Sequence, residues 1–574
     1  MSALSVFQSR SRIIFGLGMA IFAIFVLRLY HLQIILGDEY RRQADRQYVI
    51  SPGTKFERGT ILFSTREGQY LPAASTRHGT KVAITPNTIA DPKKLYQELV
   101  AIVPTLDEED FLARANRTGD PYEEILFKLD DETVAALRGL NNENLRFVEE
   151  SWRVYPHNEV GAQTIGFVAY DEDELVGRYG LERIHETTLR RENSGKSNNL
   201  FADILTNISR TVSPGWFKEG DLVTTLELST QRELNHILTE THNTWNADLT
   251  GGIVMNPRTG AIVAMDSLPS FNPNRRASED AQFFKNPSIE NVYEMGSIMK
   301  PLIVAAALET DAIDSDFSYN DTGSVVVNDR TIYNFDKEGR GPNTTLETIL
   351  ADSLNTGMVQ IEQALGHEDT KSFLENLALR EITGIDLPNE ATGLTSNLDT
   401  MGNVEYANIS FGQGIAVSPI AMTRALATLA NHGKLPTPHV GKAITYPEGS
   451  MKDIAPSIED QPQIFSPATI AGVSEILVKS VDETLGAGRY SNDRYQIAAK
   501  TGTAQIPNPN GGGYYTDRNL HTFFGYFPAS NPEFIVFFYT VFPKGARFSS
   551  QTLAPPFFEL TNFLINYHHI APDR

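Results

Sequence analysis

Apolar runs at both ends of the C-terminal half of the chain constrain its fold more than any other feature of the sequence. Residues 522–527 and 534–542 are continuously hydrophobic and are separated by a turn with two prolines, so they are typical of adjacent buried strands. Earlier in the chain, runs at 252–256 and 261–265 flank Pro-Arg-Thr-Gly, which is a hairpin signature. Strands at both ends with helical stretches between them predict an α+β domain whose sheet combines its first and last segments.

The sequence predicts a domain boundary near residue 220. Residues 221–228 are typical of a strand, and Ser229-Thr230-Gln231 opens a helix. Further helical stretches are predicted at 301–308, 346–354, 356–365, 419–430 and 467–478. The preceding region mixes β-like runs at 81–85, 145–149 and 164–169 with an amphipathic helix at 92–102. Glycine patches at 58–61 and 180–182 indicate turns there.

Composition excludes several classes of function. Lys and Arg number 49 against 71 Asp and Glu, a net charge of −22, so a nucleic-acid partner is not expected. The chain has no cysteine, which excludes disulfides, thiolate metal sites and a cysteine nucleophile. Its 12 histidines form no HExxH or HxH pair. We therefore expect neither a metal nor a cofactor.

An apolar stretch at 13–36, preceded by Arg10 and Arg12, predicts a transmembrane anchor behind a short tail, 1–12. Arg28 interrupts the stretch, but its long side chain can carry the charge to the membrane interface. A cleaved signal peptide and a buried core helix are the alternatives; no small-x-small cleavage site follows. Charges on the two sides do not decide the orientation.

The first chemical motif is Ser297-Ile298-Met299-Lys300, at the start of an apolar helical stretch. A serine in the first turn lies at the positive end of the helix dipole, which favours a developing alkoxide. A lysine three residues on lies on the same face, and its amine can act as a base if burial keeps it neutral. A simple helix cap beside a solvated lysine is the alternative. No other lysine in the chain completes this spacing.

The second motif is Ser353-Leu354-Asn355, between two apolar helical stretches where the hydroxyl and the amide can be held rigidly. Ser318-Tyr319-Asn320 has the same S-x-N form but lies in a polar segment typical of a turn. We therefore favour Ser353 over Ser318.

The third motif, Lys500-Thr501-Gly502-Thr503, continues a predicted strand. Glycine in a strand leaves room for another backbone to approach closely. A peptide ligand can then lie alongside as an added strand, with the lysine and the two threonine hydroxyls facing its terminal carboxylate. An ordinary loop between strands is the alternative.

The three motifs follow one another in the order found in penicillin-binding proteins and class A β-lactamases. The chain resembles class B penicillin-binding proteins, which are monofunctional peptidoglycan D,D-transpeptidases, over nearly its whole length. Further landmarks that support the resemblance are 28–33, 58–61, 180–182, 257–265, 383–388 and 412–415. The sequence departs from the family pattern at Met295 and Ile298 and in the segment 60–68, which lacks the usual Asp-Arg.

The resemblance implies a fold and a location. Residues 221–574 are expected to form a transpeptidase domain with the serine-acyltransferase (penicillin-binding/β-lactamase-like) fold. Residues 37–220 are expected to form an elongated α+β pedestal of the dimerisation type. The resemblance also implies a cytoplasmic tail, a single-pass anchor in the cell membrane and a catalytic domain on the outer side of that membrane.

The resemblance also implies a reaction. Lys300 takes the proton of Ser297, which attacks the carbonyl between the two terminal D-alanines of a peptidoglycan stem peptide. Backbone N–H groups of Ser297 and Thr503 form the oxyanion hole, Ser353 carries a proton to the leaving amine, and Lys500 shapes the local field. The implied catalytic residues are Ser297, Lys300, Ser353, Asn355 and Lys500, and the substrate-binding residues are Thr501, Gly502 and Thr503.

The implied partners are donor and acceptor stem peptides, β-lactams that acylate Ser297, a membrane glycosyltransferase and division-complex proteins. Asn355 resembles division-type enzymes, since elongation-type relatives usually carry Asp there. An elongation-type transpeptidase, a D,D-carboxypeptidase, and a largely non-catalytic membrane scaffold or β-lactam sensor remain alternatives. A class A β-lactamase is disfavoured because no E-x-x-L-N follows the second motif; Glu405-Tyr406-Ala407-Asn408 has the wrong spacing.

Overall fold

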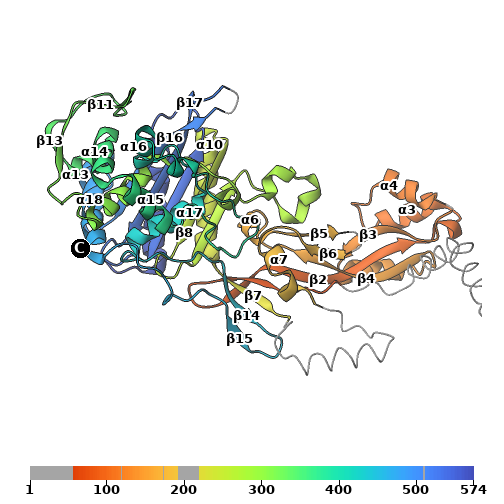
Figure 1. Cartoon of the computed structure of the whole chain (residues 1–574). Helices are drawn as coiled ribbons and strands as arrows, with labels where there is room; N and C mark the ends of the chain where they lie inside the picture. Colours follow the sequence, from red (N-terminus) through yellow and green to blue (C-terminus); the bar gives the residue numbers. More distant parts are fainter. Residues whose placement is uncertain (1–55, 118, 172–173, 192–218, 509–510) are drawn as a thin grey trace, which may run out of the picture. The chain divides into compact units, whose positions relative to one another are not determined.

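The computed structural model describes residues 56–117, 119–171, 174–191, 219–508 and 511–574. These residues form two compact units (Figure 1), a smaller one built on 77–152 and a larger one that contains 58–76, 153–191 and everything described from 219 onward. The predicted tail and anchor, 1–36, lie outside the described residues. Within the described ranges no helix combines the length and the apolar character needed to cross a membrane. The domain limits 37–220 and 221–574 stay a prediction.

The smaller unit has its own core of strands and short helices. Its elements are the later part of β2 (Tyr70–Ile84), α3 (Pro92–Val100), α4 (Glu108–Ala115), β3 (Glu123–Leu129), α5 (Asp131–Gly139) and most of β4 (Leu145–Val154). β2 pairs with both β3 and β4. Asp91, Asp107 and Asp130 cap the three helices by accepting main-chain N–H bonds, which explains why each helix begins where it does. The predicted helix at 92–102 is confirmed as α3.

The two glycine patches meet at a buried ion-pair network in the larger unit. Arg58 Nε donates to Glu182 Oε2 at 2.5 Å, and Arg153 Nε donates to Glu182 Oε1 at 2.7 Å. The Glu182 side chain is 0% exposed, and a buried carboxylate is tolerated only when it is paired this closely. Burial opposes ionisation, but Arg153 and Arg58 hold the pKa of Glu182 below its usual value. The patches therefore do more than form turns.

Short elements surround this network in the larger unit. They are β1 (Ile61–Ser64), α6 (Ala162–Ile165), β5 (Val168–Asp171), β6 (Glu174–Gly177), α7 (Gly180–Ile184), α8 (Glu186–Leu189), β7 (Asp221–Glu227), β14 (Gly441–Thr445) and β15 (Met451–Asp453). The predicted strand at 164–169 is correct only at its end, where β5 begins; before that the chain makes α6 and turns at Gly166 (φ +78°). A Cβ at Gly166 would lie 1.8 Å from the Tyr179 carbonyl oxygen, so the backbones meet there.

A five-stranded antiparallel sheet forms the centre of the larger unit. Its order is β16 (Ala498–Pro507), β17 (Tyr514–Phe527), β18 (Phe534–Val541), β8 (Leu249–Met255) and β9 (Ile262–Leu268). The last strand of the chain thus pairs with the first strand of this sheet, as the sequence predicted. β16, which carries the third motif, is an edge strand of this sheet.

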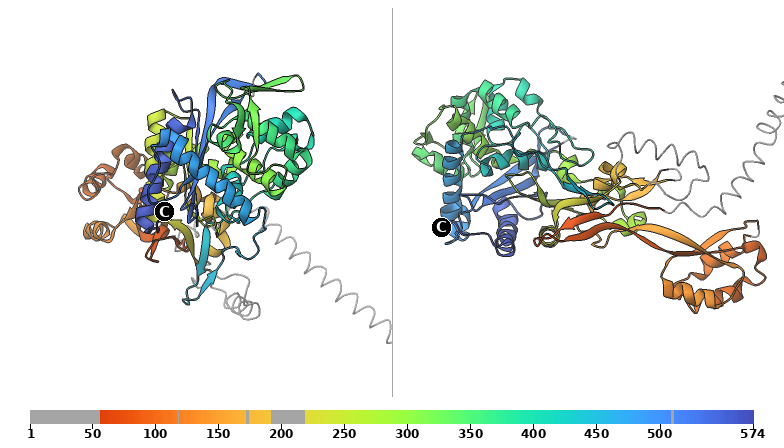
Figure 2. Two further views of the ribbon diagram at one scale, coloured as in Figure 1. Left: turned by 90° about the vertical axis from the view of Figure 1, so that its left-hand side faces the viewer. Right: turned by 90° about the horizontal axis from the view of Figure 1, so that it is seen from below.

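Helices cover both faces of this sheet (Figure 2). Phe534, Val536 and Phe538 of β18 point into the core shared with α10 (Leu228–Trp245) and α20 (Ala554–His568). Ile535, Phe537 and Tyr539 of the same strand point into the opposite core. Burial on both faces explains why these strands are continuously apolar instead of alternating.

The remaining helices lie mainly on the second face. They are α11 (Pro287–Glu290), α12 (Lys300–Glu309), α13 (Leu346–Ala351), α14 (Asn355–Leu365), α15 (His367–Asn376), α16 (Asn403–Ser410), α17 (Pro419–Leu426) and α18 (Pro467–Lys479), and a short α19 (Ser549–Thr552) precedes α20. The helices predicted from 229, 301, 346, 356, 419 and 467 are confirmed. The polar segment that contains Ser318 is a strand, β10 (Ser318–Asp321), followed by β11 (Ser324–Val327), β12 (Arg330–Tyr333) and β13 (Gly341–Thr345).

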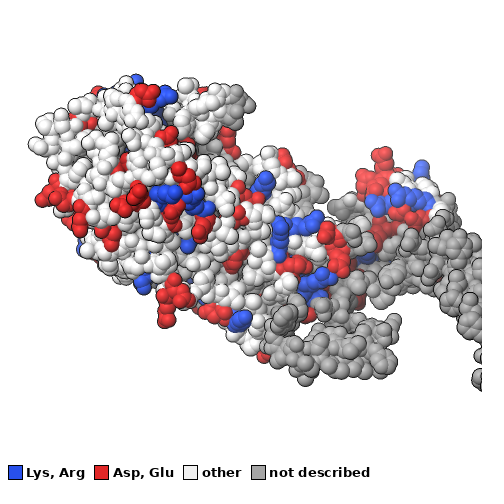
Figure 3. All heavy atoms as spheres, viewed as in Figure 1, with Lys and Arg blue, Asp and Glu red and all other residues white. Residues whose placement is uncertain are grey.

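Charged side chains are mixed over the face shown in Figure 3, where basic groups lie beside acidic ones. The hydrogen bonds of the larger unit include a pair that Arg380 donates to the two carboxylate oxygens of Asp399. In the part of the chain that the structure describes, no group of three or more His, Cys, Asp or Glu side chains is arranged to hold a metal ion.

Candidate active site

Ser297 lies in a tight 3-10 turn, η5 (Gly296–Met299), that runs directly into α12. The Lys300 N–H donates to the Ser297 carbonyl, so the two side chains lie one turn apart on the same face. Gly296 has φ +65°, and a Cβ there would lie 2.9 Å from the Thr503 carbonyl oxygen. The glycine therefore lets the half-buried serine lie directly against the third motif.

Ser353 occupies a strained turn at the end of α13. Its φ of +57° is left-handed, and the Leu354 N–H donates to the Ile349 carbonyl at 2.9 Å. This is the helix-ending turn that normally uses glycine, and a serine there costs about 1 kcal/mol. Because α14 begins at Asn355, the turn places the second motif at a helix–helix junction, as predicted.

The alternative S-x-N motif lies elsewhere. Ser318 is an exposed residue of β10 and pairs with Thr345 of β13. The amines of both motif lysines contact Ser353. The structure thus brings together Ser353, Lys300 and Lys500, the combination that the sequence favoured.

The third motif lies along the edge strand β16. Side chains alternate, so half-buried Thr501 and Thr503 share one face of the strand, while Lys500 and Gly502 are buried on the other. A Cβ at Gly502 would lie 2.2 Å from Thr522 Oγ1, which explains the glycine. Among the described strands none pairs with the outer edge of β16, and such an edge has the form that accepts an extended peptide as an added strand.

The Ser353 hydroxyl bridges the two lysines. Lys500 Nζ lies 3.0 Å from Ser353 Oγ, and Lys300 Nζ lies 3.3 Å from the same oxygen. Lys300 Nζ also donates to the Ser353 carbonyl at 2.6 Å and to Asn355 Oδ1 at 2.9 Å. Lys300 is 0% exposed and Lys500 is 4% exposed, so both amines are withdrawn from water.

Burial changes the protonation of both amines. Burial first, and then the charge of Lys500, lowers the pKa of Lys300 well below its usual value. Burial lowers the pKa of Lys500 to about 7, against the opposing effect of the Asp352 carboxylate. Lys300 is therefore the more readily neutral of the two amines, and Lys500 carries its charge below a pH of about 7.

Three residues that the sequence analysis did not assign to the site hold its parts together. Gly412 accepts a bond from the Gly296 N–H at 2.9 Å, and a Cβ at Gly412 would lie 2.0 Å from the Gly296 carbonyl oxygen. Thr522 Oγ1 donates to the Met295 carbonyl at 2.9 Å. Asp352 lies next to Ser353 and acts on Lys500 through its charge. Of these, only Gly412 carried a signal, as part of the landmark 412–415.

Solved structures share the fold. Penicillin binding protein 3 from Mycobacterium tuberculosis, complexed with aztreonam, superposes with a TM-score of 0.68 and 20% identity, covering 91% of this chain and 98% of that one. A peptidoglycan synthetase from Bifidobacterium adolescentis gives a TM-score of 0.66 and 18% identity over 91% of this chain and 97% of that one.

Sequence relatives and family models agree with this fold. Stage V sporulation protein D of Bacillus subtilis is 28% identical over 95% of this chain and 84% of its own length. The probable peptidoglycan D,D-transpeptidase PenA of Neisseria gonorrhoeae is 26% identical over 99% of this chain and 94% of its own length. Residues 54–213 match the penicillin-binding protein dimerisation domain, and residues 250–560 match the penicillin binding protein transpeptidase domain. The chain therefore belongs to the penicillin-binding protein transpeptidase family.

Proposed function

We propose that the chain is a peptidoglycan D,D-transpeptidase that cross-links stem peptides through a Ser297 acyl-enzyme and releases D-Ala. The observation that carries this proposal is the Ser353 hydroxyl, which lies within hydrogen-bond distance of both Lys300 and Lys500. The PenA relative is named a probable peptidoglycan D,D-transpeptidase, which supports the same reaction for this chain.

Acylation begins with a neutral Lys300. A neutral amine has two N–H groups, and the Ser353 carbonyl and Asn355 Oδ1 can accept both of them. Its lone pair is then free to take the proton of Ser297 Oγ, one turn away. The Ser297 oxygen attacks the carbonyl between the two terminal D-alanines, and main-chain N–H groups of Ser297 and Thr503 hold the oxyanion.

Collapse of the tetrahedral intermediate breaks the peptide bond. The proton held by Lys300 passes through the Ser353 hydroxyl to the nitrogen of the departing D-Ala. A charged Lys500 and the hydroxyls of Thr501 and Thr503 hold the terminal carboxylate until it leaves. An amine of a neighbouring stem peptide then attacks the acyl-enzyme, gives up its proton through the same groups and closes the cross-link.

β-Lactams carry a reactive amide and a carboxylate, the two features that this site recognises in a stem peptide. They therefore acylate Ser297. The base of class A β-lactamases has no counterpart here, since Glu405 belongs to helix α16 and lacks the required spacing.

The cellular setting is part of the proposal. A single-pass anchor at 13–36 holds the catalytic domain on the outer side of the cell membrane, where stem peptides are found. Asn355 favours septal wall synthesis over elongation, with a membrane glycosyltransferase and division proteins as partners.

The experiment is an exchange assay with a stem-peptide thioester and a D-amino acid. The parent protein is expected to form the exchanged amide, and Ser297→Ala is expected to form none. Hydrolysis without exchange would assign a D,D-carboxypeptidase instead. Equal product from the Ser297→Ala variant would contradict the proposal.

A further inference from the structure

The segment 318–345, which contains β10–β13, contacts the second motif through residues other than the two motif lysines. Asn355 Nδ2 donates to the Tyr333 carbonyl at 3.1 Å, and Thr356 Oγ1 donates to Asp321 Oδ1 at 2.8 Å. Side-chain and main-chain groups of this segment thus contact the residues that follow Ser353. The strained turn at Ser353 needs such support, since the left-handed conformation is unfavourable for serine.

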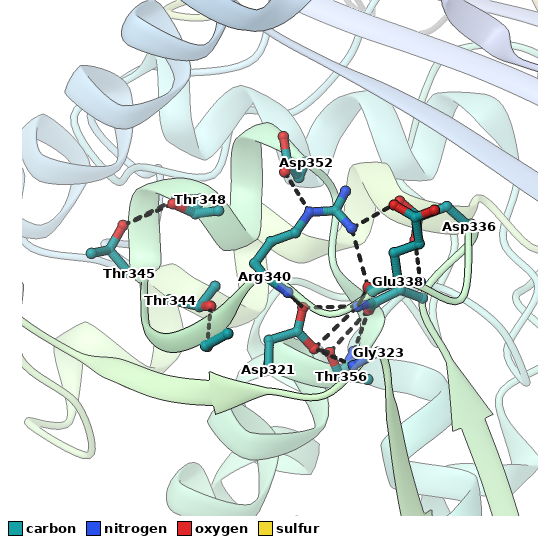
Figure 4. Close-up of polar contacts among 12 residues, drawn as sticks. Asp321, Gly323, Asp336, Glu338, Arg340, Thr344, Thr345, Thr348, Asp352 and Thr356 are labelled. Atoms are coloured by element: carbon teal, nitrogen blue, oxygen red, sulfur yellow. Dashed lines mark hydrogen bonds and ion pairs between the residues drawn. The ribbon is translucent and has the colours of Figure 1, made fainter.

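Arg340 connects this segment to the other side of the same turn (Figure 4). Its Nε donates to Asp352 Oδ2 at 2.9 Å, and its Nη1 donates to Asp336 Oδ2 at 2.8 Å. Its main-chain N–H donates to Asp321 Oδ2 at 3.0 Å. The guanidinium is therefore fixed by two carboxylates, and its backbone is fixed by a third.

Asp352 immediately precedes Ser353, so the contact that Arg340 makes to its carboxylate also restrains the turn that positions the Ser353 hydroxyl. The same carboxylate is the charged group that acts on Lys500. Arg340 thus controls both the position of the turn and how much of the Asp352 charge Lys500 experiences.

We propose that Arg340 is a positioning residue for acylation: it holds Asp352 so that the Ser353 hydroxyl stays between Lys300 and Lys500. This inference rests on the proposed transpeptidase function and adds a residue to it. Arg340 acts through Asp352 and touches neither the nucleophile nor the reacting atoms.

The charges around Lys500 fix the direction of the expected pH effects. Lys300 faces it across Ser353, and Asp352 acts on it from the residue that follows α13; Arg340 and Asp336 lie behind Asp352. Lys500 must be charged to hold a carboxylate, so acylation falls as the pH rises through its pKa. Without the positive charge of Arg340, the negative charge of Asp352 acts more strongly on Lys500 and raises the pKa of Lys500. Loss of the Asp352 charge lowers it.

The test measures the acylation rate constant with a fluorescent penicillin as a function of pH, for Arg340→Gln, Asp352→Asn and the double variant. Both single variants break the same ion pair and are expected to slow acylation about tenfold or more. In a plot of the acylation rate constant against pH, the fall on the alkaline side (the alkaline limb) is expected to move to higher pH in Arg340→Gln. The same limb is expected to move to lower pH in Asp352→Asn. The double variant is expected to return the limb towards the parent position while acylation stays slow.

Two further variants complete the design. Arg340→Lys keeps the charge and is expected to restore the position of the limb, with a rate between parent and Arg340→Gln because lysine cannot bridge two carboxylates rigidly. Arg380→Gln breaks a comparable two-carboxylate contact, to Asp399 and Glu375, and is expected to leave the profile unchanged.

Shifts in the same direction for both single variants, no shift, or parental rates would overturn the proposal. Asp352→Asn is nearly isosteric, so it decides the question even if Arg340→Gln does not fold. Ser297→Ala, measured in the same assay, distinguishes failure of the Arg340 proposal from failure of the proposed function. Labelling of that variant would overturn the proposed function itself.

Discussion

The main-chain carbonyl oxygen of Ser353 lies 2.6 Å from Lys300 Nζ, closer than the Ser353 hydroxyl at 3.3 Å. The second motif therefore contributes a fixed backbone acceptor in addition to its two side chains. That carbonyl accepts a hydrogen bond from one N–H of a neutral Lys300, so the lone pair of the amine points away from it. The left-handed turn at Ser353 is what turns this carbonyl towards the lysine.

Substitutions at Ser353 separate strain from chemistry. Ser353→Gly relieves the left-handed conformation, whereas Ser353→Ala keeps it. The glycine variant is expected to be about 1 kcal/mol more stable than the alanine variant in chemical denaturation. Both lack the hydroxyl, so both are expected to lose acylation equally. Equal stability of the two variants would contradict backbone strain at residue 353. Retained acylation in either variant would contradict proton transfer through the Ser353 hydroxyl.

Two glycines of the same unit are expected to respond oppositely to alanine. At Gly502 a Cβ would lie 2.2 Å from Thr522 Oγ1 and 2.9 Å from the Met295 carbonyl, so Gly502→Ala separates the third motif from the nucleophile turn. We expect slower acylation and a lower melting temperature. Gly472 of α18 has open space around its Cβ position, and Gly472→Ala is expected to stabilise by about 0.5–1 kcal/mol. Full activity of Gly502→Ala would argue against close backbone contact.

Glu362 of α14 makes stability depend on pH. Burial raises its pKa from 4.5 to about 7, and a His367 ring nitrogen lies 3.5 Å from its carboxylate. The folded state thus binds more protons than the unfolded state between those two values, so the free energy of unfolding falls as the pH rises through this interval.

Glu362→Gln removes this dependence. It is expected to gain about 1–3 kcal/mol over the parent above the folded-state pKa, and little below the unfolded-state pKa. Denaturant titrations at both ends of the interval measure the difference. Exposed Glu368 provides the control, because Glu368→Gln removes a carboxylate that folding leaves in contact with water. A gain from Glu362→Gln that does not vary with pH would contradict the assignment.

The buried network around Glu182 is expected to contribute strongly to the free energy of unfolding. Glu182→Gln leaves Arg153 without its carboxylate and Arg58 with Glu186 alone, and is expected to cost about 3–5 kcal/mol. The exposed pair of Glu174 and Arg190 is the control, and Glu174→Gln is expected to cost less than about 1 kcal/mol. Similar unfolding midpoints for the two variants would show that the Glu182 pairing contributes little.

Features set by neighbouring residues could be predicted from the sequence. The apolar run that became β18 could only be buried on both faces, and the spacing of Ser297 and Lys300 placed them one turn apart. The short polar motif at Ser353 was identified because apolar helical stretches flank it. In each case the local pattern already contained the physical cause.

Features set by distant contacts could not be predicted. Arg340 and Asp352 are unremarkable in sequence, and only the folding of 318–345 over the second motif brings them together. The left-handed conformation of Ser353 carries no signal, because glycine is the residue normally found there. Helix α20 is missing from the predictions although the sequence does carry a signal for it. Phe557, Leu560 and Leu564 recur at helical spacing, and two prolines before them belong to the first turn of the helix.

Locating the covalent adduct tests the central claim most directly. The protein is incubated with a β-lactam, digested, and examined by mass spectrometry for the modified peptide. The account predicts one adduct, on Ser297, that disappears in Ser297→Ala while the melting temperature of that variant stays near that of the parent. An adduct on any other residue, or undiminished labelling of a folded Ser297→Ala variant, would contradict it.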